Sequence, residues 1–447
     1  MTPRARLFAT AFVAFGLMVG GGQATAKTPA SAHETAAPRI VAPESVGFDA
    51  ARLKKLDAYM AGTVAQGRVA GMTTLLVRHG KVVAFNTYGQ KDLATAAPMD
   101  RDAMFRIYSM SKPLTGVAMM ILFEEGKWKL DDPVTKFVPE FKDLKVMTGV
   151  DDKGNMITVP ANRPPTMREI MSHTAGFGYG LGDKHPVDKM FRDRRVLGAS
   201  SLQEMINRMA DIPLMFQPGT SWSYSASVDV QGYIVEKISG QKFGDFLQQR
   251  VFGPLKMNDT AFYTGPDKAS RLAKVYVIDP RTGKLAAADN LFGGRMPDYT
   301  KPPAMESGGG GLVSTTADYG RFAQMILNKG ELDGARILSP AAVELMGTNV
   351  IPQSVLVTSN GTSGQYFNEA VGFGLDFAVV NDPRKAGSLG GKGEMSWGGA
   401  AGTWFWIDPT NDLYFVGMIQ RFGRGGGDDL GTMARTLTYQ ALTHPEK

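Results

Sequence analysis

Two short segments of this 447-residue chain carry a serine followed three positions later by a lysine, a spacing that suits nucleophilic chemistry. They are Ser109-Met110-Ser111-Lys112 and Ser239-Gly240-Gln241-Lys242. Residues three apart on a helix share one face, so the serine and lysine side chains can touch. A lysine whose pKa is lowered by burial or by a nearby cation can take the serine proton and leave a nucleophilic oxygen.

The first of these segments has the better setting for catalysis. It precedes the apolar run Leu114–Leu122, which predicts a helix starting at this point. Pro113 is tolerated in a first turn, where N–H groups lack intrahelical partners, and those free N–H groups favour an oxyanion. Gly240 instead marks the end of a predicted helix, where the dipole has the opposite sign. Ser109 is therefore the predicted nucleophile and Lys112 its partner, the alternative being a serine that only caps a helix.

Other familiar catalytic and ligand-binding patterns are missing from the sequence. No G-x-S-x-G elbow occurs, which argues against an α/β-hydrolase. The five histidines include no H-E-x-x-H motif and no close pair, so a metal site is not expected. His173 lies in a Ser-His-Thr-Ala-Gly segment that is typical of a loop after a helix, and it is assigned to structure. The glycine runs at 308–311 and 390–391 lack the ending of a phosphate-binding loop and predict tight turns.

Composition is that of an ordinary globular protein, with 43% hydrophobic and 21% charged residues. The formal charge is +6, and it falls to about +4 without Arg4 and Arg6. This charge is too dilute for nucleic-acid binding, and no basic run with interleaved aromatic residues occurs. A nucleic-acid partner is therefore not expected.

The first 26 residues have the pattern of an export signal. Arg4 and Arg6 precede the 13-residue apolar stretch Leu7–Val19, and Ala24-Thr25-Ala26 supplies a cleavage site. The apolar stretch is shorter than the ~20 residues that a membrane span needs, so a membrane anchor is not expected. The chain has no cysteine, which excludes both a cysteine-linked lipid and disulfides, and suits an oxidising compartment. We predict a signal peptide over 1–26 and a periplasmic or secreted mature protein.

Strand and helix signals lie at both ends of the mature chain. Asp49 is predicted to cap a helix with apolar residues at helical spacing. Hairpins are predicted over 73–85 and 404–418, and a helix over 429–441 closes the chain. These segments predict an α/β fold in which an antiparallel sheet is built from both termini and flanked by helices.

The rest of the chain is divided as follows. Residues 27–41 are rich in Ala, Pro and Thr and predict a linker, and 42–447 are expected to form one domain. Residues of about 113–300 are expected to form a mostly helical insertion into the sheet layer. Helices are predicted over 166–172, 202–210, 228–239 and from Asp318 to Gly330.

Five motifs then occur in a fixed order. They are Tyr108-Ser109-Met110-Ser111-Lys112-Pro113, the segment 167–176 that ends in Ser-His-Thr-Ala-Gly, the segment 217–225 that contains Tyr224, the segment 309–315, and Trp397-Gly398-Gly399-Ala400. Together they resemble the motifs of the serine β-lactamase and penicillin-binding-protein superfamily, in its class C-like branch, and most closely the family VIII carboxylesterases. The resemblance covers nearly the whole mature chain and implies the β-lactamase/transpeptidase-like fold.

The resemblance also implies roles for particular residues. Ser109 is the nucleophile, Lys112 its partner, and Tyr224 the base that cooperates with the lysine; Tyr233 is a weaker alternative to Tyr224. The backbone N–H groups of Ser109 and Ala400 would form the oxyanion hole. Donors of this kind typically lower a barrier by ~3 kcal/mol each.

Two positions depart from the β-lactamase pattern. Ala226 stands where an asparagine usually holds the substrate amide, and Trp397 replaces a lysine or histidine that holds the carboxylate of a β-lactam. Both changes remove polar contacts to penicillin-like substrates. Trp397, Gly398, Gly399 and Ala226 are the predicted pocket residues.

These observations predict an exported serine hydrolase that cleaves small carboxylic esters through an acyl-enzyme on Ser109 and needs no cofactor. A β-lactamase, D-amino-acid peptidase or amidase on the same fold is the first alternative. A weakly catalytic penicillin-recognising or scaffold protein is the second.

Overall fold

The computed structural model describes residues 39–182, 184–288, 290–291, 294–356, 367–423 and 428–444, which belong to one compact unit starting at Arg39. The predicted signal peptide and residues 27–38 of the predicted linker lie outside these ranges. Residues 40 and 41 already belong to the folded unit, because Ile40 pairs with Val82 and the Val41 N–H donates to the Val82 carbonyl. Within these ranges no helix has the length and apolar character needed to cross a bilayer.

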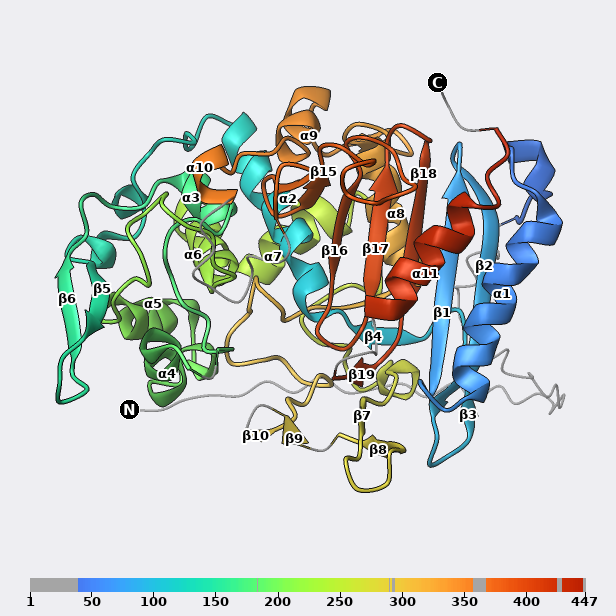
Figure 1. Ribbon diagram of the computed structural model, residues 1–447, viewed down its shortest axis with the longest axis horizontal. Coiled ribbons are helices and arrows are strands. Elements are labelled where there is room, and N and C mark those ends of the chain that lie inside the picture. Colours follow the sequence, from blue (N-terminus) through green and yellow to red (C-terminus); the bar gives the residue numbers. More distant parts are fainter. Residues whose placement is uncertain are drawn as a thin grey trace, which may run out of the picture. The chain divides into compact units, whose positions relative to one another are not determined.

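An eight-stranded antiparallel sheet forms the centre of this unit (Figure 1). Its strands, in spatial order, are β14 Val371–Phe373, β15 Ala378–Val380, β16 Met395–Gly398, β17 Trp404–Asp408, β18 Leu413–Met418, β1 Gly71–Arg78, β2 Lys81–Asp92 and β3 Ala97–Pro98. The N-terminal β1 pairs with the C-terminal β18, with Leu75 opposite Val416. The prediction of a sheet built from both termini is thus confirmed.

The β1–β2 hairpin follows from its local sequence. Every residue of β1 is buried, since helices cover both faces of the sheet here, and this explains its apolar run. His79 and Gly80 connect the strands with φ values of 51° and 66°. Positive φ at both turn residues matches the right-handed twist of paired strands, which is why a glycine is favoured there.

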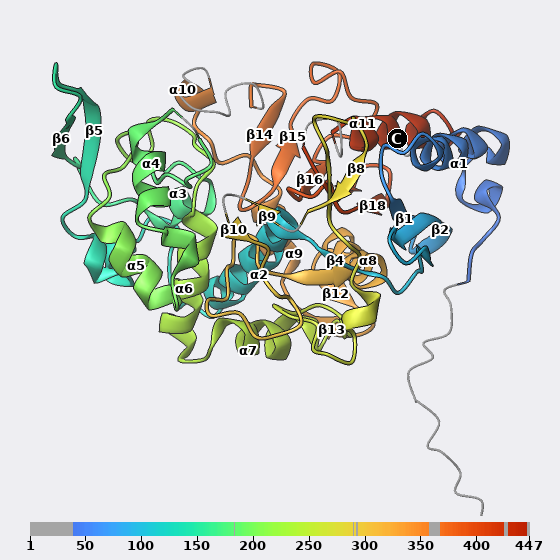
Figure 2. The ribbon, with the colours of Figure 1, turned by 90° about the horizontal axis from the view of Figure 1, so that it is seen from below.

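Helices pack on both faces of the sheet (Figure 2). Helices α1 Ala50–Ala65 and α11 Asp428–Tyr439 lie on one face, and α8 Thr316–Leu327 lies on the other. Asp49 caps α1 as predicted, because its side chain accepts the Arg52 N–H at 2.9 Å. Helix α8 begins two residues before the predicted Asp318, because the Thr315 side chain caps it by accepting the Asp318 N–H.

Among the described residues, the region of 113–300 contains six α-helices, although loops and strands make up the larger part of it. Helices α2 to α7 are Ser111–Glu124, Met167–Met171, Pro186–Asp193, Leu202–Ala210, Ser227–Ser239 and Phe243–Leu247. The region also contains strand pairs that the sequence analysis did not predict: β5 Lys145–Val150 with β6 Met156–Pro160, β7 Tyr276–Ile278 with β8 Leu285–Ala287, and β9 Asn290–Leu291 with β10 Gly294–Arg295. The β5–β6 hairpin projects from the end of the unit opposite α1 (Figure 1).

The remaining elements are short. They are β4 Met104–Arg106 paired with β11 Val313–Thr315, β12 Glu331–Leu332 paired with β13 Ala335–Arg336, β19 Arg421–Phe422 beside β7, and the helices α9 Pro340–Met346 and α10 Gln353–Leu356. The β4–β11 pair matters most for function, since β4 leads directly into the segment that carries Ser109.

Candidate active site

Ser109 lies in a single 3₁₀ turn, Tyr108–Met110, that runs directly into α2. The residue before it, Tyr108, has a φ of 43°, a left-handed conformation that is costly for a tyrosine. The Tyr108 ring packs edge-on against Phe422 with centroids 5.1 Å apart, and this contact helps to hold the conformation. The cap residue of α2 is Met110, without a side-chain cap bond, so Ser109 does not cap the helix.

Lys112 is fully buried in the first turn of α2 and makes three polar contacts. Its Nζ lies 3.4 Å from Ser109 Oγ, 3.3 Å from the Tyr179 hydroxyl and 2.6 Å from the Gly309 carbonyl oxygen. The carbonyl only accepts, so one N–H must point to Gly309. An uncharged amine can donate to Gly309 and Tyr179 and still direct its lone pair at Ser109, which is the arrangement that proton transfer from the serine requires.

Tyr179 is a site residue that the sequence analysis missed. It lies on the loop before α4, and its backbone N–H and that of Gly180 donate to the buried Asp188 carboxylate at 2.8 and 2.7 Å. Burial, the Asp229 carboxyl and the neighbouring Tyr224 raise the pKa of the Tyr179 phenol well above its usual value. Its hydroxyl therefore stays protonated and serves as a hydrogen-bond partner of Lys112.

Tyr224 contacts the same lysine through its aromatic ring. Lys112 Nζ lies 4.4 Å from the centroid of the Tyr224 ring, a cation–π distance. The Tyr224 hydroxyl accepts a hydrogen bond from Trp397 Nε1 at 3.4 Å. The predicted nucleophile, its lysine and the predicted tyrosine are thus assembled at one place, and the structure adds Tyr179 to them.

His173 holds the segment that carries Tyr224. Its carbonyl accepts the Ser223 N–H at 3.0 Å, and its Nδ1 accepts the Ser225 N–H at 3.3 Å, so both neighbours of Tyr224 are bonded to it. Burial and the Lys112 cation lower the pKa of the His173 imidazole well below its usual range.

The pH dependence of activity should therefore show no histidine step. With its pKa lowered, His173 is neutral above pH ~6.5. We expect kcat/KM, measured from pH 5.5 to 9.5, to rise with pH along one ascending limb, without an inflection near ~6.5. His173→Asn keeps an acceptor for the Ser225 N–H and should leave the midpoint of the profile in place. A wild-type inflection near ~6.5, together with an inactive His173→Asn enzyme, would instead assign the proton chemistry to a Ser–His pair.

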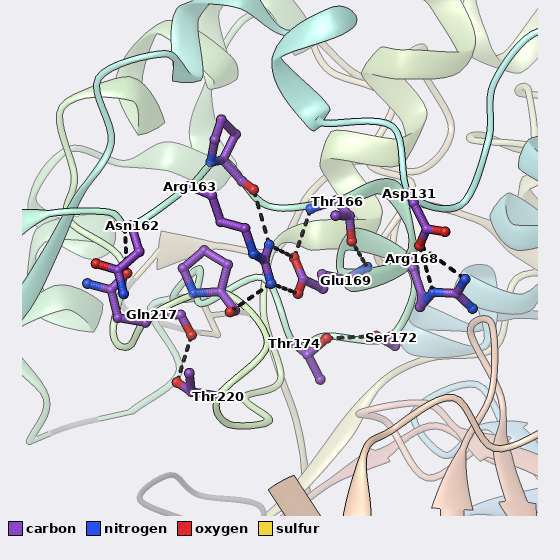
Figure 3. Close-up of polar contacts among 12 residues, drawn as sticks. Asp131, Asn162, Arg163, Thr166, Arg168, Glu169, Ser172, Thr174, Gln217 and Thr220 are labelled. Carbon is purple, nitrogen blue, oxygen red and sulfur yellow. Dashed lines mark hydrogen bonds and ion pairs between the residues drawn. The ribbon is translucent and has the colours of Figure 1, made fainter. Parts of the chain in front are cut away.

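An ion pair attaches the Tyr224 segment to α3 (Figure 3). Arg163 forms two bonds to the Glu169 carboxylate, at 2.8 and 2.6 Å, and also donates to the Pro218 carbonyl at 3.1 Å. Glu169 completes a capping box with Thr166 at the start of α3. One bidentate pair thus fixes a helix end and the loop that leads to Tyr224.

The end of β16 approaches the nucleophile segment closely. A Cβ on Gly399 would lie 2.4 Å from the Ile107 carbonyl oxygen, so only glycine fits here. This contact places the turn that contains Ala400 beside the residues that precede Ser109. Within the described part of the chain, neither the Ser109 N–H nor the Ala400 N–H donates a hydrogen bond, and both are free for an oxyanion.

The predicted pocket residues differ in accessibility. Trp397 and Gly399 are half-buried and Gly398 is exposed. Trp397 packs against Tyr224 and Phe373 and joins an aromatic cluster that includes Trp222 and Phe367. Ala226 instead has no exposed surface, because it starts α6 inside the main core, so its side chain does not reach a substrate here.

Ser239 and Tyr233, the weaker alternatives to Ser109 and Tyr224, have other hydrogen-bond partners. Ser239 ends α6 before Gly240, and among the described residues its hydroxyl bonds only to the local Gln241 N–H. Tyr233 is buried and donates to Gln203. Among the residues that the structure describes, no three His, Asp or Glu side chains gather as a metal site would require.

Comparison with known proteins gives consistent results. The family model described as Beta-lactamase matches residues 56–440. Protein Rv1367c of Mycobacterium tuberculosis is 36% identical over 359 residues, covering 79% of this chain and 86% of the relative. Esterase EstB of Burkholderia gladioli is 29% identical over 412 residues, covering 89% and 98%. The solved structure of EstCE1, a hydrolase with promiscuous acyltransferase activity, has a TM-score of 0.72 at 25% identity, covering 87% and 99%.

The structural likeness confirms the predicted β-lactamase/transpeptidase-like fold. This fold brings the start of α2, the start of α6 and the end of β16 together, and three of the motifs lie at these places.

Proposed function

This chain belongs to the β-lactamase family and is a serine hydrolase, and from that premise we propose that it cleaves small carboxylic esters through an acyl-enzyme on Ser109. The observation that carries the proposal is the position of Lys112, buried and within 3.4 Å of Ser109 Oγ while its other bonds are satisfied. That arrangement activates a serine without a metal or an organic cofactor.

The proposed reaction has two steps. Ser109 Oγ attacks the ester carbonyl while its proton passes to Lys112, and the oxyanion is bound by the N–H groups of Ser109 and Ala400. The proton then passes to the alkoxide as the carbon–oxygen bond breaks, with Tyr224 assisting, and an alcohol leaves. Water attacks the acyl-enzyme by the same route and releases the carboxylic acid.

An ester is favoured over a β-lactam because of what surrounds Tyr224. Trp397 and the aromatic cluster with Trp222 and Phe373 present rings where β-lactamases present a cation. Ala226 offers neither an amide nor an exposed side chain. A β-lactam carboxylate and side-chain amide would therefore find few partners, whereas a small apolar acyl or alcohol group would lose less hydration.

The test is one assay panel on the purified chain. We expect p-nitrophenyl esters of short acyl chains to be hydrolysed at least about 100-fold faster in kcat/KM than a chromogenic cephalosporin or a D-alanyl dipeptide. Comparable ester and cephalosporin hydrolysis would exclude the ester preference. A single burst of p-nitrophenol without turnover would support the weakly catalytic alternative.

Acyl transfer to an alcohol is a second candidate activity, favoured by the reported promiscuity of EstCE1. Any alcohol that reaches the acyl-enzyme competes with water for the same carbonyl, so one intermediate serves both outcomes. Adding a primary alcohol to the ester assay should yield a new ester at the expense of free acid. If only acid forms at every alcohol concentration, the enzyme is a hydrolase alone.

We also propose that the protein is exported to the periplasm or the medium. The support is the basic and apolar pattern of residues 1–26 and the absence of cysteine from the chain. The mature protein from a cell fraction should begin at Lys27, as read by N-terminal sequencing. Recovery of the intact N-terminus from the cytosol would contradict export.

A further inference from the structure

Asp229 is a fully buried acid in the first turn of α6 that the proposed reaction does not yet use. One carboxylate oxygen, Oδ1, accepts hydrogen bonds from the Ser307 hydroxyl and from the Gly309 N–H, the latter at 3.2 Å. The other, Oδ2, has no hydrogen-bond partner among the described residues. A buried carboxylate with a free oxygen is costly, and its retention calls for a reason.

Gly309 connects this acid to the catalytic lysine. Its N–H donates to Asp229, and its carbonyl accepts from Lys112 Nζ at 2.6 Å. A Cβ on Gly309 would lie 2.5 Å from Asp229 Oδ2 and 2.8 Å from the Tyr179 hydroxyl. The carboxylate, the phenol and the carbonyl that Lys112 contacts therefore meet around one residue that must be glycine.

Several charged or titratable groups face Lys112 from different elements. They are His173 and Tyr179 on loops, Tyr224 before α6, Asp229 on α6, and Asp376 before β15. Burial raises the pKa of Asp376 well above its usual value, against the lowering effects of the Gln231 amide and Lys112, and among the described residues only that amide donates to its carboxyl. Burial also raises the pKa of Asp229, but the Ser307 hydroxyl, Lys112 and the Gly309 N–H favour its charged form. Asp229 is thus the acid equipped to carry a negative charge beside the lysine.

We propose that Asp229 is a positioning residue of the acyl-transfer site, which holds Gly309 against Lys112 and stabilises the lysine cation that forms when Ser109 loses its proton. The inference rests on the proposed role of Lys112 as proton acceptor. A buried aspartate does the same for the histidine of a serine-protease triad, where it orients the base and stabilises its charged form. Here Asp229 acts on Lys112 in two ways. It binds the N–H of Gly309, whose carbonyl accepts from Lys112 Nζ, and its carboxylate attracts the lysine cation electrostatically.

Asp229→Asn tests this role because it keeps an oxygen for Ser307 and Gly309 and removes only the charge. A carboxylate beside an ammonium favours its charged form, so loss of the carboxylate should move the ascending limb of kcat/KM to lower pH by about one unit. The plateau rate should fall by roughly 10- to 100-fold, because the cation formed during the reaction loses its stabilisation. Both are measured with p-nitrophenyl butyrate from pH 5.5 to 9.5.

Asp318→Asn is the matched control. Asp318 is also buried and also accepts one backbone N–H and one hydroxyl, from Asp259 at 2.7 Å and from Thr260 at 2.9 Å. It lies on α8, and among the described residues none of its hydrogen-bond partners belongs to the site. Its replacement should lower the free energy of unfolding and leave the midpoint of the profile unchanged. If Asp229→Asn slows the enzyme without moving the midpoint, or if both variants move it equally, Asp229 is structural and the inference is wrong.

Two further measurements test the role of Asp229 independently of protein stability and of the choice of ester substrate. Ser307→Ala removes one donor to the carboxylate and should shift the midpoint in the same direction by less than Asp229→Asn. The rate of Ser109 labelling by a fluorophosphonate, followed by mass spectrometry, reports the same proton transfer without an ester. If esters are not hydrolysed but labelling shifts with pH as described, the proposed substrate is wrong and the inference stands. An unshifted labelling profile overturns the inference alone.

Discussion

Ser109→Ala is expected to lower kcat/KM for short-chain p-nitrophenyl esters by at least about 10⁴-fold, because the acyl-enzyme cannot form without the serine oxygen. The fold should survive the change. The structure shows that Met110, not Ser109, is the cap of α2, and the Ser109 hydroxyl bonds only to Lys112 among the described residues. The free energy of unfolding, measured in urea, should therefore change by less than about 1 kcal/mol.

Ser239→Ala is the matched control, since it removes the other serine of the Ser-x-x-Lys type. Its hydroxyl accepts one local N–H at the end of α6, and in the described part of the chain no site residue forms a hydrogen bond with it. Activity should stay within about two-fold of wild type. Mass spectrometry after a brief pulse of ester should find the acyl group on Ser109 of the wild type. An active Ser109→Ala enzyme, or an inactive Ser239→Ala enzyme, would show that the wrong motif has been assigned.

Tyr224→Phe is expected to have the next largest effect, a loss of about 100-fold in kcat, the scale of a lost general acid or base. The ring would remain over Lys112, so only the hydroxyl chemistry is removed. Tyr179→Phe should cost less, about 10-fold, because its protonated hydroxyl orients Lys112 and does not act as a base. Single-turnover kinetics on one ester compare the two variants directly.

Tyr233→Phe serves as the control for this pair, because its hydroxyl bonds to Gln203 away from the site. It should leave kcat and KM unchanged. If Tyr179→Phe is inactive and Tyr224→Phe is close to wild type, the hydroxyl that serves the reaction belongs to Tyr179. Loss of activity in all three variants would indicate that a shared effect on folding is being measured, which urea unfolding would reveal.

The sequence was informative wherever the decisive interactions are local. Asp49 caps α1 by a bond to the N–H three residues on, and His79 and Gly80 close the β1–β2 turn. Ser109 and Lys112 meet because they lie three positions apart at the start of a helix. The predicted start of α8 at Asp318 was two residues late. The Thr315 side chain caps this helix, and the cap, not the apolar run, sets where the helix begins.

Only the tertiary structure decided what surrounds Lys112. Tyr179 lies 67 positions from the lysine and Gly309 lies 197 positions from it, and both reach it from loops whose course depends on distant contacts. The motif read around His173 ended at Gly176, and nothing in its spacing indicated that the tyrosine three residues later would point at the lysine. Periodicity and spacing describe what one helix or strand presents to its neighbours. They carry no information on which loops meet, because that depends on how the buried side chains of the whole unit pack together, and the partners of the lysine are set at that level.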